Sequence, residues 1–164
     1  MQISYSGKVQ FCVFLINQQI FAIDIRQIRE VNPNINIFEV PSTSEHIRGM
    51  LNVRGKIVMI IDVAVKFGKP RITLSNKCHN IILKNYHELC RVKDLELSPE
   101  LKKIGDYSIG FIVEEVMDIM EFDSTQILPP PAHLSEVDSR YLSGVIKYNN
   151  KLLLVLNAWS VILA

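Results

Sequence analysis

The sequence lacks both the cysteine pattern of a disulfide-stabilised fold and the long apolar segments of a membrane protein. Its three cysteines, Cys12, Cys78 and Cys90, are odd in number and irregularly spaced, which is typical of free thiols in a reducing compartment. No apolar run approaches the ~18 residues that are needed to span a bilayer. The first residues also lack the basic flank, apolar core and small-residue cleavage site of a secretory signal. We therefore expect a cytoplasmic protein without membrane insertion.

Charge of one sign is not in excess. The chain has 18 Lys and Arg residues against 17 Asp and Glu residues, which gives a net charge of +1. We therefore expect no nucleic-acid partner, because a basic surface that would attract one is not indicated. The hydrophobic content of 48% is ample for a core, and 164 residues permit one ordinary domain or two small ones.

Sequence motifs of catalysis are also missing. There is no Gly-rich phosphate loop, G-x-S-x-G elbow or paired-carboxylate motif. Nucleophilic chemistry would require Cys12 or Cys90 beside a histidine, and Cys12 lies within a predicted strand, where a free cysteine is typical of a core. His46 and His133 are isolated and are expected on the surface. We therefore expect no catalytic residues and no enzymatic activity.

One cluster has the residue types of a zinc site. Cys78, His79, His87 and Cys90 carry thiols and imidazoles, which are zinc ligands. Their spacing is irregular, however, and adjacent Cys and His residues seldom chelate one ion together. We expect no metal and no cofactor. The alternative, a metal- or small-molecule-binding β-barrel protein that uses residues 78–106, stays open.

The clearest local pattern is a β-hairpin at residues 49–62, GMLNVRGKIVMIID. The apolar run from Ile57 to Ile61 is short and rich in β-branched residues, which favours a buried strand. The pair Arg54-Gly55 is suited to a two-residue turn, because glycine adopts positive φ without a steric cost. The pairs expected across the ladder are Val53 with Lys56, Leu51 with Val58 and Met50 with Met59.

The hairpin pattern occurs twice in the chain. Residues 144–157, GVIKYNNKLLLVLN, match residues 49–62 without a gap, with glycine on glycine and an Asn-Asn pair on the Arg-Gly turn. Asparagine also tolerates the left-handed region, so the turn chemistry is kept. Upstream, residues 21–31 match residues 109–119 in the same way. Two matching blocks in the same order indicate a duplicated β unit.

The remaining segments predict further short elements. Residues 26–31 are compatible with a helix or a bent strand, and the repeat and the β-rich context favour the strand. Residues 107–122 are compatible with one long bent strand or two short ones. The segment 85–106 is charged and interrupts a hairpin, so we expect a partly disordered insertion with a short helix at Ser98-Pro99. Further strands are expected at 8–17, 20–25 and 80–84. A helical turn is expected at 63–67 with Asp62 as its cap, and a helix at 158–163 with Asn157 as its cap. Trp159 and Ile162 of this last helix would pack on the barrel.

These features together resemble the CheW-like chemotaxis coupling domain. The resemblance is carried by FAIDIRQIREV at 21–31, by Val40-Pro41, and by HIRGMLNVRGKIVMIIDVAVKFG at 46–68. In the second half, YLSG at 141–144 and the terminal LLLVLN fit the same pattern. The resemblance covers roughly residues 9–164. Three features depart from the family pattern: Met59 occupies the position of the usual proline, the insertion is long, and little room for a long terminal helix follows Trp159.

The resemblance implies a mainly β fold. It consists of two interleaved five-stranded SH3-like β-barrels with pseudo-two-fold symmetry, short helical turns and a short C-terminal helix. We expect a single domain over residues 1–164, with subdomain 1 at about 18–68 and subdomain 2 at about 79–156. An N-terminal strand at 8–17 and a C-terminal segment at 157–164 would pack across the two subdomains. Residues 85–106 would form an inserted loop.

The resemblance also implies a function, that of a non-catalytic scaffold that couples chemoreceptors to a CheA-type histidine kinase. Its partners would be the regulatory domain of the kinase and the cytoplasmic tip of the receptor, which lies against a groove between the barrels. A stand-alone regulator with other partners is a further alternative. The partner-binding positions that the resemblance implies are Ile28, Glu30, Val31, Gly49 and Arg54.

Two questions about these positions remain open in the sequence. Arg54 and Glu30 could form a charge-assisted pair that orders the turn and shapes the receptor-facing edge, or Arg54 could be an ordinary exposed turn residue. Ile28 and Val31 could be exposed contacts for a receptor helix or part of the barrel core. Strand edges in both barrels are candidate docking surfaces unless loops cap them.

Overall fold

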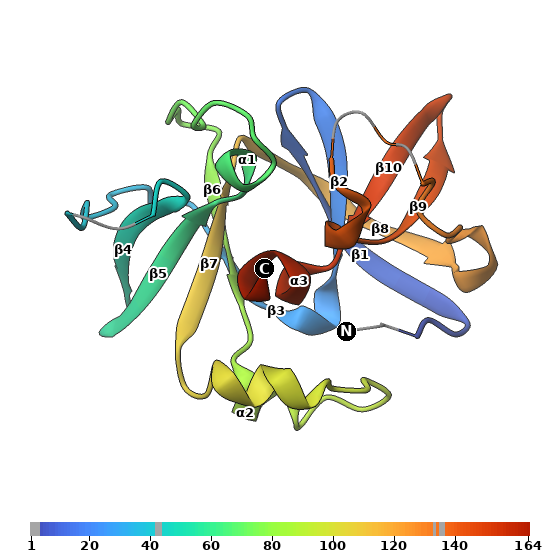
Figure 1. The fold of residues 1–164 in the computed structure, drawn as a ribbon, viewed down its shortest axis with the longest axis horizontal. Helices are drawn as coiled ribbons and strands as arrows, with labels where there is room; N and C mark the ends of the chain where they lie inside the picture. The colour runs from blue at the N-terminus through green and yellow to red at the C-terminus, as the bar shows by residue number, and fades with distance from the viewer. Residues whose placement is uncertain (1–3, 42–43, 133, 135–136) are drawn as a thin grey trace.

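The computed structural model describes residues 4–41, 44–132, 134 and 137–164, which form two five-stranded sheets with short helices (Figure 1). The strands are β1 Lys8–Ile16, β2 Gln19–Asp24, β3 Ile28–Asn32, β4 Ile47–Val53, β5 Lys56–Asp62, β6 His79–Leu83, β7 Ser108–Val113, β8 Glu115–Asp123, β9 Leu142–Tyr148 and β10 Lys151–Leu156. The helices are α1 Val63–Lys66, α2 Tyr86–Leu89 and α3 Ala158–Leu163, and the 3₁₀ turns are η1 Ile25–Gln27, η2 Pro99–Lys103, η3 Ser124–Gln126 and η4 Ser139–Tyr141.

The strand orders of the two sheets show how the duplication is built. Sheet A has the order β8-β1-β2-β10-β9, and sheet B has the order β3-β6-β7-β5-β4. The chain repeats one unit of five strands and a helix, first as β1 to β5 with α1 and then as β6 to β10 with α3. If each strand is replaced by its counterpart in the other unit, the order of sheet A becomes the order of sheet B. The two sheets are therefore related by the pseudo-symmetry that the sequence repeat predicts.

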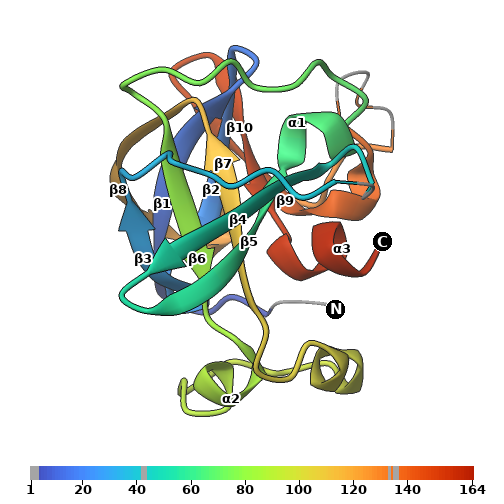
Figure 2. The same cartoon turned by 90° about the vertical axis from the view of Figure 1, so that its left-hand side faces the viewer.

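Each sheet combines strands from both units. Sheet A takes β1 and β2 from the first unit, and sheet B takes β6 and β7 from the second. The chain crosses between the sheets at η1 and again between β7 and β8. The two sheets lie side by side in Figure 1, and sheet B lies in front of sheet A in Figure 2. Neither sheet therefore coincides with one of the ranges 18–68 and 79–156. The reason is that the first hairpin of each unit pairs with the later strands of the other unit.

The local predictions for the hairpin and the caps are confirmed. The β4–β5 ladder pairs Val53 with Lys56, Leu51 with Val58 and Met50 with Met59. Asp62 accepts a hydrogen bond from the backbone N–H of Ala64 and begins α1, and Asn157 accepts one from Ser160 and begins α3. Residues 26–31 form a 3₁₀ turn followed by a strand, and residues 107–122 give two strands that belong to different sheets.

The segment 85–106 is ordered, which corrects the expectation of partial disorder. It contains α2 and η2, and Ser98 begins η2 as predicted by accepting from the N–H of Glu100. The side chains of Leu89 and Leu101 are fully buried, and Ile104 is 6% exposed. These apolar anchors supply the burial that orders an otherwise charged segment. The segment extends from sheet B below the rest of the molecule (Figures 1 and 2).

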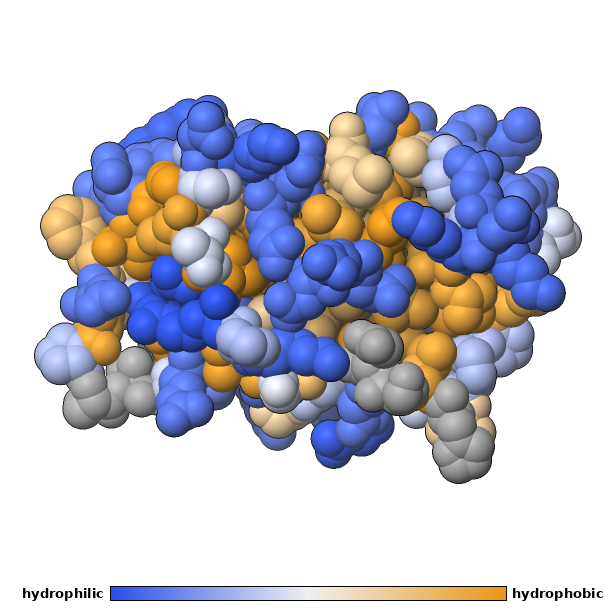
Figure 3. Space-filling model, turned by 90° about the horizontal axis from the view of Figure 1, so that it is seen from above, coloured by the Kyte–Doolittle hydropathy of each residue, from blue (hydrophilic) through white to orange (hydrophobic). Residues whose placement is uncertain are grey.

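The main apolar core spans both sheets, and a second, smaller apolar cluster is formed by strands of sheet A alone. Trp159 of α3 is 1% exposed, and Ile162 packs against the main core, as predicted. Cys12 is buried within β1. Apolar surface is also visible from above over both sheets, among hydrophilic side chains (Figure 3). In the part of the chain that the structure describes, no helix is long and apolar enough to cross a membrane.

Candidate functional site

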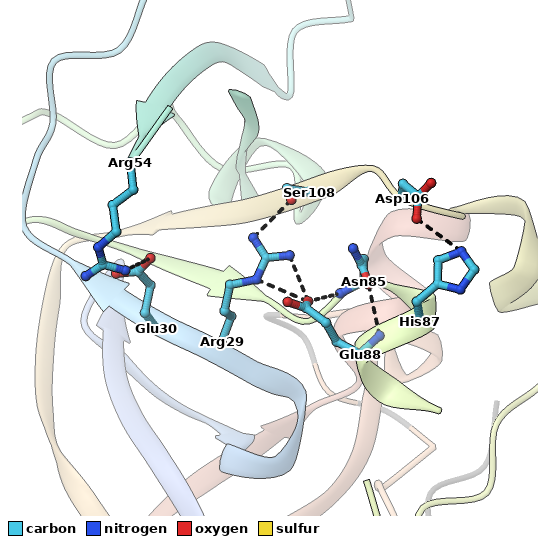
Figure 4. A network of polar contacts seen from close by, with 8 residues as sticks. All are labelled: Arg29, Glu30, Arg54, Asn85, His87, Glu88, Asp106 and Ser108. Carbon is cyan, nitrogen blue, oxygen red and sulfur yellow. Dashed lines mark hydrogen bonds and ion pairs between the residues drawn. The ribbon is translucent and has the colours of Figure 1, made fainter. Parts of the chain in front are cut away.

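The predicted ion pair between Arg54 and Glu30 is formed. Arg54 Nη1 donates to Glu30 Oε1 at 2.9 Å (Figure 4). Arg54 has φ of 51° and precedes Gly55 in the β4–β5 turn, and the N–H of Gly55 donates to Asn52 Oδ1 at 3.0 Å. The Arg54 side chain is 79% exposed, whereas the Glu30 side chain is 18% exposed. The pair therefore joins a mostly buried carboxylate on edge strand β3 to an accessible cation on the turn after edge strand β4.

A bulge in β3 shapes the surface beside this pair. The β3–β6 register shifts between Ile28 and Glu30, so that Arg29 is the extra residue. Ile28 is half-buried against the core, and Val31 is 37% exposed. Of the two readings that the sequence left open, Ile28 fits the core and Val31 fits an accessible apolar position.

Gly49 is buried on β4, where its role is steric. A Cβ on Gly49 would lie 2.1 Å from Phe38 O, and its φ is 146°. The close approach lets Phe38 and Met50 exchange two backbone hydrogen bonds of 2.8 Å. Leu128 and Val145 form the equivalent bridge on β9. These bridges each pair one position on the outer edges of β4 and β9, whereas no such bridge is formed on β3 or β8 among the described residues.

A second ion pair lies inside the molecule and is not evident from the sequence. Arg48 Nη1 donates to Asp62 Oδ2 at 3.0 Å and to Ile72 O at 2.7 Å. The Asp62 side chain has no exposed surface and also accepts from the N–H groups of Ala64 and Ile72. This carboxylate holds the end of β5, the start of α1 and the connection to the second unit together. The N-cap role of Asp62 was predictable, but its arginine partner was not.

Arg29 and Glu88 form a third ion pair that sequence reasoning missed. Arg29 donates to Glu88 Oε2 from Nε at 3.1 Å and from Nη2 at 2.7 Å, and its Nη1 lies 3.0 Å from Ser108 Oγ (Figure 4). Glu88 also accepts from the N–H of Asn85, whose side chain accepts from the N–H of Glu88 in a reciprocal capping box. The spacing Asn85-x-x-Glu88 was the available signal for this cap.

The electrostatics of Glu88 follow from these contacts. Burial alone would raise the pKa of Glu88, but hydrogen bonds from Arg29 and from the Asn85 backbone outweigh burial and hold that pKa below its usual value. Glu88 is therefore a charged acceptor at neutral pH, and it anchors the start of the 85–106 segment to strand β3.

The four possible zinc ligands do not come together. Cys78 is buried with its thiol near Ser75 and Thr73 O, and His79 Nδ1 lies 2.9 Å from Lys77 O. His87 lies 3.1 Å from Asp106, and Cys90 is exposed. Among the described residues, no group of three or more His, Cys, Asp or Glu side chains could hold a metal ion.

Of the two isolated histidines, His46 lies among the described residues and His133 does not. His46 is partly buried, and burial together with the positive charge of Lys66 lowers its pKa.

Comparison with known proteins gives one consistent family. The sequence profile of the CheW-like domain matches residues 10–163. A protein named chemotaxis protein CheW from Klebsiella aerogenes is 24% identical over 148 residues, which cover 90% of this chain and 78% of the relative. The Bacillus subtilis protein of the same name is 22% identical over 150 residues, which cover 92% of this chain and 84% of the relative.

A solved structure shares the fold. The crystal structure of the scaffolding protein TtCheW from Thermoanaerobacter tengcongensis superposes with a TM-score of 0.74 at 24% sequence identity. The match covers 94% of this chain and 87% of that protein.

Proposed function

The chain belongs to the CheW-like domain family, and from this premise we propose that it is a non-catalytic scaffold that couples chemoreceptors to a CheA-type histidine kinase in the cytoplasm. The observation that carries the proposal is the match over residues 10–163, together with curated relatives that are named chemotaxis proteins. The absence of a gathered metal site among the described residues gives the metal-binding alternative no support.

Strand β3 and the adjacent β4–β5 turn are the proposed receptor-facing surface. Arg54 is accessible and is oriented by Glu30, and Val31 offers apolar area on the same edge strand. Ile28 supports this strand from the core side, and Gly49 permits the close packing of Phe38 against β4. A helical hairpin tip would contact such a surface through apolar side chains and a complementary acidic group.

The regulatory domain of the kinase is the second proposed partner. An edge strand presents unpaired backbone groups, and a barrel of the partner can dock against it. Strand β8 is an edge of sheet A, and Met117 and Ile119 on it are 49% and 50% exposed. Two docking edges on opposite sheets would let one small chain hold two proteins at once.

Co-sedimentation tests this function. Vesicles that carry a receptor signalling fragment should sediment the chain, and should sediment the kinase regulatory domain only when the chain is present. Wild-type chain that binds neither partner would refute the coupling function. A chain that binds both partners but never together would refute the scaffold role.

A further inference from the structure

The segment 85–106 contacts the turn η1 and strand β3, which carries proposed receptor-facing residues. Arg29 of β3 binds Glu88 at the start of the segment. Arg26 of η1 donates from Nη1 to Asp94 O at 2.9 Å, near the middle of the segment. Arg26 is itself held by Asp24, with Nη2 2.6 Å from Asp24 Oδ2. The two arginines flank Ile28 in the sequence, so the insertion contacts the chain on both sides of that residue.

Further interactions hold both the segment 85–106 and Arg29 in place. The segment is anchored by the fully buried side chains of Leu89 and Leu101. Glu88 is fixed by the capping box with Asn85, and the Arg29 and Glu88 side chains are only 21% and 31% exposed. Arg29 also reaches Ser108 on β7. Partial burial and two hydrogen bonds to one carboxylate make this pair stronger than an ordinary surface ion pair.

The other half of the molecule shows what the insertion adds. In the repeat, Glu114 is the counterpart of Arg26, and its carboxylate accepts from the N–H of Asn17 in the short β1–β2 turn at 2.8 Å. Met117 is the counterpart of Arg29, at the equivalent bulge of β8. Met117 is 49% exposed, whereas Arg29 is tied to Glu88 and Ser108. The bulge residue of β3 is therefore held by an ion pair at the position where its β8 counterpart points into solvent.

We propose that the 85–106 segment is a positioning element for the receptor-facing surface, in which Glu88, by holding Arg29, fixes the β3 bulge from which Glu30 and Val31 project. This inference rests on the proposed function and names the element that positions its receptor-facing site. Glu88 is a positioning residue and does not itself need to touch the receptor. A bulge sets the direction of neighbouring side chains, so loss of its anchor changes the presentation of Glu30 and its partner Arg54.

Binding measurements with four variants test the proposal. We expect Glu88→Ala and Arg29→Ala each to weaken binding to a receptor-tip fragment about five- to tenfold, and the double variant to be no weaker than either single one, because both remove the same contact. Glu100→Ala is the matched control, since Glu100 is an exposed glutamate in the same segment; its receptor affinity should be unchanged. Affinity for the kinase regulatory domain should stay at the wild-type value in all four, because the kinase edge lies on sheet A.

The outcomes separate the possible explanations. Wild-type receptor affinity in Glu88→Ala would overturn the positioning role while leaving the coupling function intact. Equal losses for receptor and kinase domain would also overturn it, because they indicate a general loss of structure. Failure of the wild-type chain to bind the receptor would instead refute the proposed function.

Hydrogen exchange tests the anchor without any partner. The backbone amides of β3 that donate to β6 should exchange faster in Glu88→Ala than in wild type, and at the wild-type rate in Glu100→Ala. Unchanged β3 exchange in Glu88→Ala would contradict the proposal that Glu88 fixes the bulge.

Discussion

Glu30 on one edge strand and Arg54 beyond the other meet at 2.9 Å, so a single ion pair links both ends of the strand order of sheet B. Because the Arg54 side chain is 79% exposed, the pair contributes less than about 1 kcal/mol to stability. The main effect of the pair is to orient the accessible guanidinium of Arg54 beside edge strand β3. The buried pair of Arg48 and Asp62, by contrast, contributes mainly to stability.

Replacing Arg48 should destabilise the protein strongly. In Arg48→Ala, the fully buried carboxylate of Asp62 loses its cationic partner, and we expect the free energy of unfolding to fall by about 3–5 kcal/mol. Chemical denaturation measures this change. Arg71→Ala is the control: Arg71 lies 3.8 Å from Glu39 with both side chains at least half exposed, so the loss should be under about 1 kcal/mol. Similar losses in the two variants would contradict this account.

The two repeated glycines should differ in their tolerance of alanine. In Gly144→Ala the new Cβ would lie 2.8 Å from Leu128 O, and we expect a loss of about 1–3 kcal/mol. In Gly49→Ala the Cβ would lie 2.1 Å from Phe38 O with φ at 146°, so the loss should be larger. Thermal unfolding of the two variants gives the ranking. The reverse order would show that the two bridges are not packed as described.

Glu88 should make the free energy of unfolding depend more strongly on pH in the acid range. Its pKa is lower in the folded chain than in the unfolded chain, so the unfolded chain binds more protons as the pH falls. The stabilisation is present above the ordinary glutamate pKa of ~4.3 and is lost as the pH falls through the lower folded-state value. Glu88→Gln should therefore lose less stability than wild type between neutral pH and acid. Parallel profiles for the two proteins would count against a charged Glu88.

The three thiols should differ in reactivity. Cys90 is exposed, while Cys12 and Cys78 are buried, and burial raises the pKa of Cys12 to about 11. At mildly alkaline pH, a thiol reagent should modify Cys90 in the native protein and the other two only after unfolding. Peptide mass mapping identifies the labelled cysteine, and Cys90→Ser should abolish native labelling. Fast labelling of Cys12 in the native state would contradict its place in the core.

The sequence predicts local structure well where short-range chemistry decides it. The Arg54-Gly55 turn fixed the register of the hairpin, and the polar residues at Asp62 and Asn157 marked two helix starts. The repeat also revealed the duplication, and the family resemblance supplied the two barrels. These features depend on residues that are close together in the chain.

The contacts that sequence reasoning missed are distant in the chain. Arg29 and Glu88 are separated by 59 positions, and no periodicity links them. Likewise, a repeat shows that two units exist but does not define which strands pair between them. The order of the 85–106 segment was also missed, because two buried leucines outweigh its charged composition.

Receptor-dependent activity of the kinase is the decisive measurement for the proposed coupling function. Autophosphorylation of the CheA-type kinase should be measured with receptor vesicles, with and without the chain, and with the Arg54→Ala variant. We expect the wild-type chain to raise the rate only when receptors are present. We expect Arg54→Ala to give a much smaller increase, with an unfolding free energy within about 1 kcal/mol of wild type. A rate that is the same with and without the wild-type chain would contradict the claim that this protein couples receptors to the kinase.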